Sequence, residues 1–171
     1  DADPAQAQAQ PAPLSERWSG ALPALDIVVD QLELQGRALG RLEVQATNQP
    51  AQACGQREWR LHTFNMATPE ATLTARGRWA VEQPGPAAAQ RHTELDFRLD
   101  VRDAGLLLQR LGMAGVVRRG KGVLQGQLQW QGVPFVPDYA SMGGVLQMDV
   151  VSGQFLKAEP GLAKLLSVLS L

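Results

Sequence analysis

The chain has 171 residues, the size of one ordinary domain, and its 16 basic and 17 acidic residues give a net charge of −1. This balance leaves no electrostatic footprint for nucleic acid or for an anionic membrane surface, so we expect no nucleic-acid partner. The single cysteine, Cys54, has neither a disulfide partner nor a histidine at zinc-ligand spacing, so it leaves the redox compartment open.

The N-terminal segment is rich in Ala, Gln and Pro. Residues 1–13 contain too little apolar bulk to offset the entropy of ordering, so we interpret 1–20 as a disordered linker and 21–171 as one β-rich domain of a longer chain. No stretch approaches the roughly 20 apolar residues that span a bilayer, and the first residues lack the features of a signal peptide. We therefore expect any export signal or anchor to lie outside this sequence.

From Leu25 onward, apolar and polar residues alternate with the period of two that is typical of half-buried strands. Such alternation favours an antiparallel sheet with one wet face, because a parallel sheet covered on both faces would show continuous apolar runs. Gly36 and Gly40 fit a turn or bulge, and the phase breaks near Thr63, which predicts another bulge. The predicted strands lie near residues 25–34, 41–47, 59–66, 71–81, 94–101, 122–131 and 144–151.

Two segments have leucines at helical spacing instead. The first, at 104–111, has Asp103 as its N-cap and stops at Gly112. The second, at 161–170, carries an apolar stripe that must be covered, so we predict that this helix caps the open end of the sheet. The stripe consists of Leu162, Leu165, Leu166 and Leu169. The predicted fold is mainly β: an antiparallel curved sheet, forming an open groove or a roll, with two short α-helices.

A weak internal repeat relates two of the predicted strands. Residues 71–79 read Ala-x-Leu-x-Ala-x-Gly-x-Trp, and residues 122–130 read Gly-x-Leu-x-Gly-x-Leu-x-Trp. Small residues on a packed face allow a close approach to the sheet. Chance similarity between two amphipathic strands explains the pattern equally well.

Residues that carry catalytic chemistry are sparse. His62 and His92 lie far apart without metal-ligand spacing, and we interpret both as ordinary polar-face residues. No hydrolase or phosphate-loop motif is present, and Asp96 and Asp100 alternate with apolar residues on the solvent face of one strand. We therefore expect a protein that is not an enzyme and that uses neither cofactor nor metal.

One basic cluster consists of Arg118, Arg119 and Lys121. It could contact a lipid headgroup, but a charged turn beside a strand is the more common explanation. Aromatic residues make up only 5% of the chain, so there is also no stacking platform for single-stranded nucleic acid.

The C-terminal half contains a distinctive series of glycine-rich strands. Residues 120–130 read Gly-x-Gly-x-Leu-x-Gly-x-Leu-x-Trp; a strand at 143–150, Gly153-Gln154-Phe155 and Glu159-Pro160-Gly161 follow. This series resembles the C-terminal region of the AsmA-like envelope proteins of Gram-negative bacteria, closest to the YhdP branch. The resemblance covers residues 95–171 well and 25–81 loosely.

The resemblance implies a periplasmic protein, tethered to the inner membrane, whose long curved sheet forms a groove with an apolar lining. It implies roles in moving phospholipid between the two membranes and in outer-membrane biogenesis. The implied partners are phospholipid, the neighbouring domains of the same long chain, and the membrane through an anchor outside this sequence.

Two functions fit these observations. The first is a non-catalytic lipid-transport segment whose apolar sheet face contacts phospholipid acyl chains. The alternative is a protein-protein interaction module in outer-membrane assembly, with a closed core and no lipid. In either case the apolar face, as lipid-facing positions or as core, consists of Leu95, Phe97, Leu99, Leu124, Leu128, Trp130, Leu146, Met148 and Val150.

Overall fold

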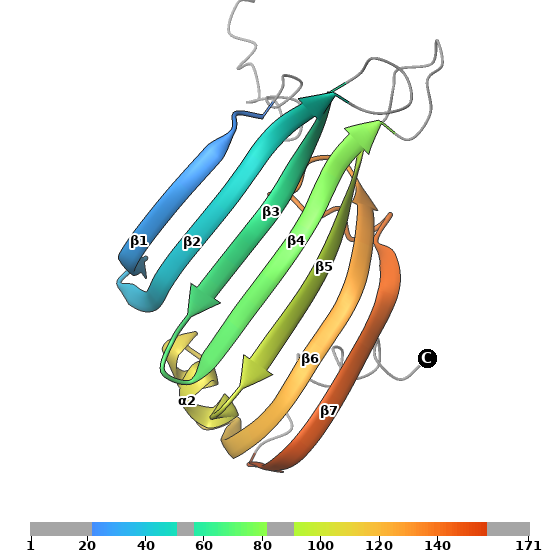
Figure 1. The fold of residues 1–171 in the computed structure, drawn as a ribbon. Helices are drawn as coiled ribbons and strands as arrows, with labels where there is room; N and C mark the ends of the chain where they lie inside the picture. The colour runs from blue at the N-terminus through green and yellow to red at the C-terminus, as the bar shows by residue number, and fades with distance from the viewer. Residues whose placement is uncertain (1–21, 51–56, 82–90, 157–171) are drawn as a thin grey trace, which may run out of the picture.

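The computed structural model describes residues 22–50, 57–81 and 91–156, which form one seven-stranded sheet with the strand order β1-β2-β3-β4-β5-β6-β7. Each strand pairs antiparallel with its neighbours in the sequence, so the chain forms an up-and-down meander (Figure 1). The strands are β1 (Leu25–Leu34), β2 (Arg37–Pro50), β3 (Arg57–Ala67), β4 (Ala71–Val81), β5 (Arg91–Val101), β6 (Val117–Gln131) and β7 (Gly143–Phe155).

The sheet is twisted, curved and open (Figure 1). The predicted mainly β, antiparallel fold is confirmed, but of the two predicted forms the closed roll is wrong. Closure requires hydrogen bonds between the first and last strands, whereas the meander keeps β1 and β7 apart as the two edges of the sheet.

The described residues contain one helix, α2 (Ala104–Arg110), between β5 and β6. As predicted, Asp103 is its N-cap: the Asp103 carboxylate accepts a hydrogen bond of 3.0 Å from the backbone N–H of Leu106. Gly112 follows the helix with a φ of 85°, a left-handed conformation that favours glycine. The second predicted helix, at 161–170, lies outside the described residues, as does the predicted linker at 1–20. The described residues therefore contain one of the two predicted helices.

The bulge predicted near Thr63 is confirmed. On β2, Gln45 pairs with Thr63 and the next residue, Ala46, pairs with Leu61, so β3 contains one extra residue at this point. The extra residue shifts the alternation by one position. Apolar residues on both sides of the bulge therefore stay on the same face of the sheet.

Five strands extend beyond their predicted ranges: β2, β3, β5, β6 and β7. β2, β6 and β7 continue into polar or glycine-containing segments, where backbone pairs such as Arg118 with Gln154 maintain the ladder. Alternation in sequence marks the half-buried part of a strand only. The prediction therefore missed the strand segments in which apolar and polar residues do not alternate.

Candidate functional site: an apolar face on an open sheet

One face of the sheet is apolar from β1 to β7, because residues paired across an antiparallel sheet lie on the same face. One row across the sheet consists of Ile27, Val44, Phe64, Ala75, Phe97, Gly126 and Leu146. The next row consists of Val29, Leu42, Met66, Leu73, Leu99, Leu124 and Met148. All seven strands thus contribute to one continuous surface.

The internal repeat lies in register on this face. Residues 71–79 of β4 and 122–130 of β6 flank β5, and the pairing places equivalent positions in the same rows. Phe97 on β5 therefore lies between Ala75 and Gly126, so its ring has a small neighbour on each side. A Cβ atom at Gly126 would collide with the backbone carbonyl of Val145 on β7. The small residues of the repeat allow the close approach of neighbouring strands.

One end of the apolar face is covered, and we call it the tryptophan end because Trp59, Trp79 and Trp130 lie there, only 3%, 3% and 4% exposed. Leu22, before β1, and Val133, after β6, pack against this cluster. Each of two indole N–H groups has a partner: that of Trp59 donates to the carbonyl of Pro23 (2.9 Å) and that of Trp130 to the carbonyl of Val133 (3.1 Å).

At the opposite end, called the α2 end, the helix is tied to two turns of the sheet. Arg110 donates two hydrogen bonds, of 2.9 and 2.7 Å, to the buried carboxylate of Glu70 in the β3–β4 turn. A further Arg110 N–H donates to the carbonyl of Ala38 (2.8 Å), and Arg37 donates to the carbonyl of Leu111 (2.8 Å). The bidentate contact with Arg110 lowers the pKa of Glu70 to about 2.

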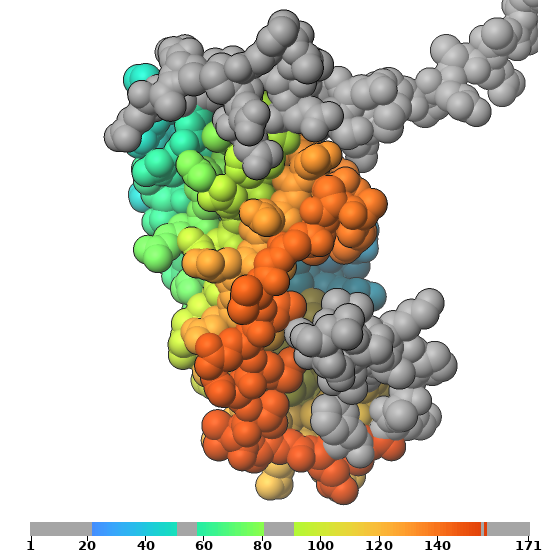
Figure 2. Space-filling view, turned by 90° about the vertical axis from the view of Figure 1, so that its right-hand side faces the viewer, coloured from blue at the N-terminus to red at the C-terminus, as the bar shows by residue number. Residues whose placement is uncertain are grey.

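Between these ends, the apolar face becomes more exposed toward β7. Leu95, Phe97 and Leu99 on β5 are half-buried, whereas Leu146, Met148 and Val150 on β7 are 37%, 46% and 68% exposed. Figure 2 views the molecule from this side and shows β7 along its surface. No described strand lies beyond β7, so its side chains have a neighbour on one side only.

The predicted site residues all lie on the apolar face, but in three environments. Trp130 is buried at the tryptophan end, and the three β7 residues are exposed. The remaining five residues, which are half-buried, are Leu95, Phe97, Leu99, Leu124 and Leu128. The structure brings all nine onto adjacent strands, β5, β6 and β7. The four leucines of the predicted capping helix lie outside the described residues.

The sequence predicted the helix at one end of the sheet but not the contacts that cover either end. Leu22, Val133 and Glu70 lie in connections without a periodic pattern, and helical spacing does not identify Glu70 as the partner of Arg110. Two strands separate Glu70 from Arg110 in the sequence. Only correlated substitutions at these two positions among relatives would have predicted their contact.

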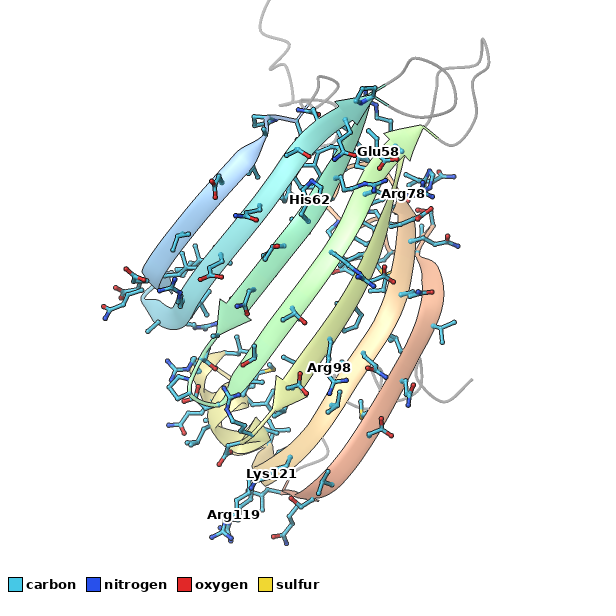
Figure 3. All side chains as sticks on the ribbon, viewed as in Figure 1. Glu58, His62, Arg78, Arg98, Arg119 and Lys121 are labelled. Carbon is cyan, nitrogen blue, oxygen red and sulfur yellow. The ribbon has the colours of Figure 1, made fainter. Side chains whose placement is uncertain are left out.

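The opposite face is polar, and its arginines pair with carboxylates (Figure 3). Arg78 donates to Glu94 at 2.7 Å and Arg98 to Asp100 at 2.8 Å. The hydrogen bonds from Arg78 lower the pKa of Glu94 to about 2. The placement of Asp96 and Asp100 on the solvent face is confirmed, since their side chains are 46% and 42% exposed.

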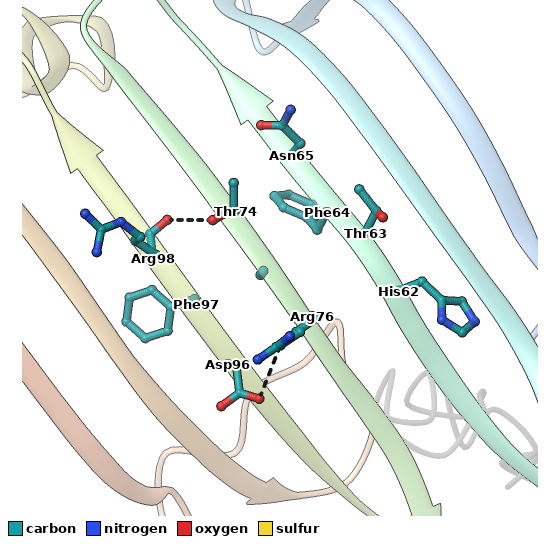
Figure 4. A pocket seen from close by; sticks show the side chains of 10 residues that line it. His62, Thr63, Phe64, Asn65, Thr74, Arg76, Asp96, Phe97 and Arg98 are labelled. Atoms are coloured by element: carbon teal, nitrogen blue, oxygen red, sulfur yellow. Dashed lines mark hydrogen bonds and ion pairs between the residues drawn. The ribbon is translucent and has the colours of Figure 1, made fainter.

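A shallow hollow of about 480 Å³ lies on this polar face, across β3, β4 and β5 (Figure 4). Arg76 and Asp96 meet there at 3.9 Å, and His62 shares a hydrogen bond of 2.6 Å with the hydroxyl of Thr47. In the described part of the chain, no group of three or more His, Cys, Asp or Glu side chains is placed to hold a metal ion. Nor is any helix there long and apolar enough to cross a membrane.

These features define a class of β protein in which one unclosed sheet separates a polar face from an apolar face. The chain matches the family model described as YhdP protein over residues 1–171, and it therefore belongs to the YhdP family. It is thus an envelope protein of the AsmA-like group, as the resemblance in its C-terminal half predicted. Comparisons with curated proteins and with solved structures find no match.

Proposed function

We propose that this chain is a non-catalytic lipid-transport segment that presents its apolar sheet face to phospholipid acyl chains. The single observation that carries the proposal is the continuous apolar face, which is covered at the tryptophan end and increasingly exposed toward β7. Membership of the YhdP family supports a periplasmic location, with an inner-membrane anchor elsewhere in the full protein.

The physical support comes from the cost of exposing this face to water. Burial of each methylene group contributes roughly 0.8 kcal/mol, so an acyl chain of a dozen or more carbons can be held by apolar contact alone. Leu146, Met148 and Val150 offer such contact on the exposed strand. Binding of this kind needs no polar recognition group, which agrees with the lack of a catalytic or ligand-binding motif in the sequence.

A protein-protein interaction module is the second candidate, and the β7 edge favours it. Among the described strands, none pairs with the outer side of β7 along Gly143–Phe155, and this strand also exposes Val145 and Val151. Exposed edges of this length accept strands from other chains. A partner bound there would cover the same strand that we assign to lipid.

Mass spectrometry of organic extracts from the purified 171-residue chain tests the proposal. We expect phospholipid to co-purify with the parent protein and to be depleted from the Met148→Lys variant, because a charge on the apolar face repels an acyl chain. Gln147→Lys is the matched control, since it adds the same charge one position away on the polar face. That control should keep its lipid.

Phospholipid no more abundant than in an unrelated soluble protein would contradict the lipid-transport proposal. A concentration-dependent protein complex formed without lipid would then support the interaction module. Equal lipid loss in Met148→Lys and Gln147→Lys would also contradict a role for the apolar face in particular.

A further inference from the structure

We infer that the α2 end of the sheet is a docking surface for an anionic lipid membrane, formed by the basic segment Arg118–Lys121 and by exposed apolar residues of α2 and the following loop. The inference rests on the proposed function, because it identifies where a lipid-carrying sheet meets a bilayer. It concerns headgroups at one end of the molecule, whereas the proposed function concerns acyl chains on one face.

The basic residues of the segment Arg118–Lys121 have no acidic partners among the described residues. Arg118, Arg119 and Lys121 are all exposed, and none of them forms an ion pair with a carboxylate of the described residues. On the polar face, in contrast, Arg41 and Arg98 each contact a carboxylate at 2.8 Å or less. Two acidic groups of the α2 end are already engaged, Glu70 by Arg110 and Asp103 by the N-terminus of the helix.

The backbone of the basic segment is irregular. The β6–β7 register shifts between Arg118 and Lys121, and Arg119 has a φ of 56°, a left-handed conformation that a residue with a side chain rarely adopts. A bulge of this kind redirects side chains at the end of a strand. Figure 3 shows Arg119 and Lys121 extending from the end of the sheet.

Packing against α2 holds this bulge in place. At Gly120 a Cβ atom would lie 2.9 Å from the Cβ of Ala104, and at Gly105 one would lie 2.7 Å from the carbonyl oxygen of Val117. Neither position therefore has room for a side chain. The helix and the basic segment are therefore closely packed and form one continuous surface.

Exposed apolar side chains lie on the helix and just after it, beside these charges. Leu106 on α2 and Leu111 and Met113 just after it are exposed. Arg37 lies at the far end of the helix, where it donates to the carbonyl of Leu111. Basic side chains that surround exposed Leu and Met residues are typical of surfaces that bind in the headgroup region of anionic membranes.

The overall charge of the chain conceals this arrangement. The net charge of −1 is a sum over the whole chain, so it does not distinguish arginines of the polar face that contact carboxylates from the exposed basic residues of the α2 end. Attraction to a membrane depends on the local charge within about a Debye length of 8–10 Å, not on the sum over the chain. The composition therefore gave no reason to expect a membrane surface, whereas the arrangement does.

Co-sedimentation with vesicles tests the inference. We expect the 171-residue chain to bind vesicles of phosphatidylcholine with phosphatidylglycerol more tightly than vesicles of phosphatidylcholine alone. Because each basic residue near an anionic surface contributes about fivefold in affinity, the variant Arg118→Gln/Arg119→Gln/Lys121→Gln should bind about a hundredfold more weakly. The matched control Arg41→Gln/Arg76→Gln/Arg98→Gln removes the same charge from the polar face and should bind much like the parent.

A second variant tests the apolar part of the surface. Leu106→Ser/Met113→Ser changes no charge, and both side chains are exposed, so the variant should keep the circular dichroism spectrum and melting temperature of the parent. We expect it to bind phosphatidylglycerol vesicles several-fold more weakly, with the residual binding more sensitive to salt.

Equal binding to both kinds of vesicle, or equal loss in the basic variant and its control, would overturn the docking surface. The outcome is separable from that of the lipid-extraction experiment. Retained vesicle binding without co-purified phospholipid would contradict the proposed function alone, whereas co-purified phospholipid without preference for anionic vesicles would contradict the docking surface alone.

Discussion

The tryptophan end and the β7 edge belong to the same apolar face, yet their environments are opposite. Trp59 and Trp79 are 3% exposed, because Leu22 and Val133 from flanking connections pack against them. Met148 and Val150 are 46% and 68% exposed, with no further described strand beside them. The comparison shows that alternation fixes which face is apolar, while the connections decide which part of that face is core and which part is left for a ligand.

The largest expected effect follows from removing a buried tryptophan. Trp59→Ala should lower the free energy of unfolding by about 3–5 kcal/mol, because it leaves a cavity in the cluster and removes the hydrogen bond to Pro23. Urea denaturation followed by circular dichroism measures the change. A loss below about 1 kcal/mol would mean that the tryptophan end is not a core, and the comparison with β7 would fail.

Breaking the contact between Glu70 and Arg110 should come next in size. Glu70→Gln removes a charged acceptor at a buried position, and we expect a loss of about 2 kcal/mol at neutral pH. The pKa of Glu70 is lowered from 4.5 to about 2, so its stabilisation is present above pH 4.5 and is lost as the pH falls toward 2.

Melting temperatures of parent and Glu70→Gln at a series of pH values check this linkage. The two curves should differ most at neutral pH and converge as the pH approaches 2. A constant difference across that range would show that the variant acts through packing and not through the charge of Glu70.

A smaller effect is expected from filling the narrow space between β6 and β7. Gly126→Ala places a Cβ atom against the Val145 carbonyl, so the strands must separate slightly, at a cost of about 1–2 kcal/mol. Gly143→Ala is the control, because the nearest atom to its Cβ, on Gln129, lies 3.8 Å away. Thermal unfolding of both variants measures the difference, and equal stabilities would refute the assigned close approach.

The smallest change in stability is expected on the exposed strand. Met148→Lys should shift the free energy of unfolding by less than about 0.5 kcal/mol, since the long Lys side chain reaches water from a position that is already 46% exposed. A melting curve close to that of the parent checks this expectation. Loss of folding would place Met148 in a core and would contradict the exposed environment assigned to β7.

The sequence predicted the strands that bear alternation, and two of them, 25–34 and 71–81, have the predicted bounds. It also predicted the Asp103 cap and the bulge near Thr63, because both leave local signals. It did not predict the burial of Trp130 by Val133 or the contact between Glu70 and Arg110. Glu70 and Arg110 are 40 residues apart, so no local pattern identifies the partner, and Val133 lies in a connection that has no periodic pattern.

Site-specific photocrosslinking along β7 tests the central claim most directly. A photoreactive side chain is placed in turn at the apolar-face positions Leu146, Met148 and Val150 and at the polar-face positions Val145, Gln147 and Asp149. If the apolar face holds acyl chains, adducts with phospholipid should form at the three even-numbered positions and be weak at the three odd-numbered ones. Adducts of equal yield at all six positions, or none above the background of an unrelated protein, would contradict the claim.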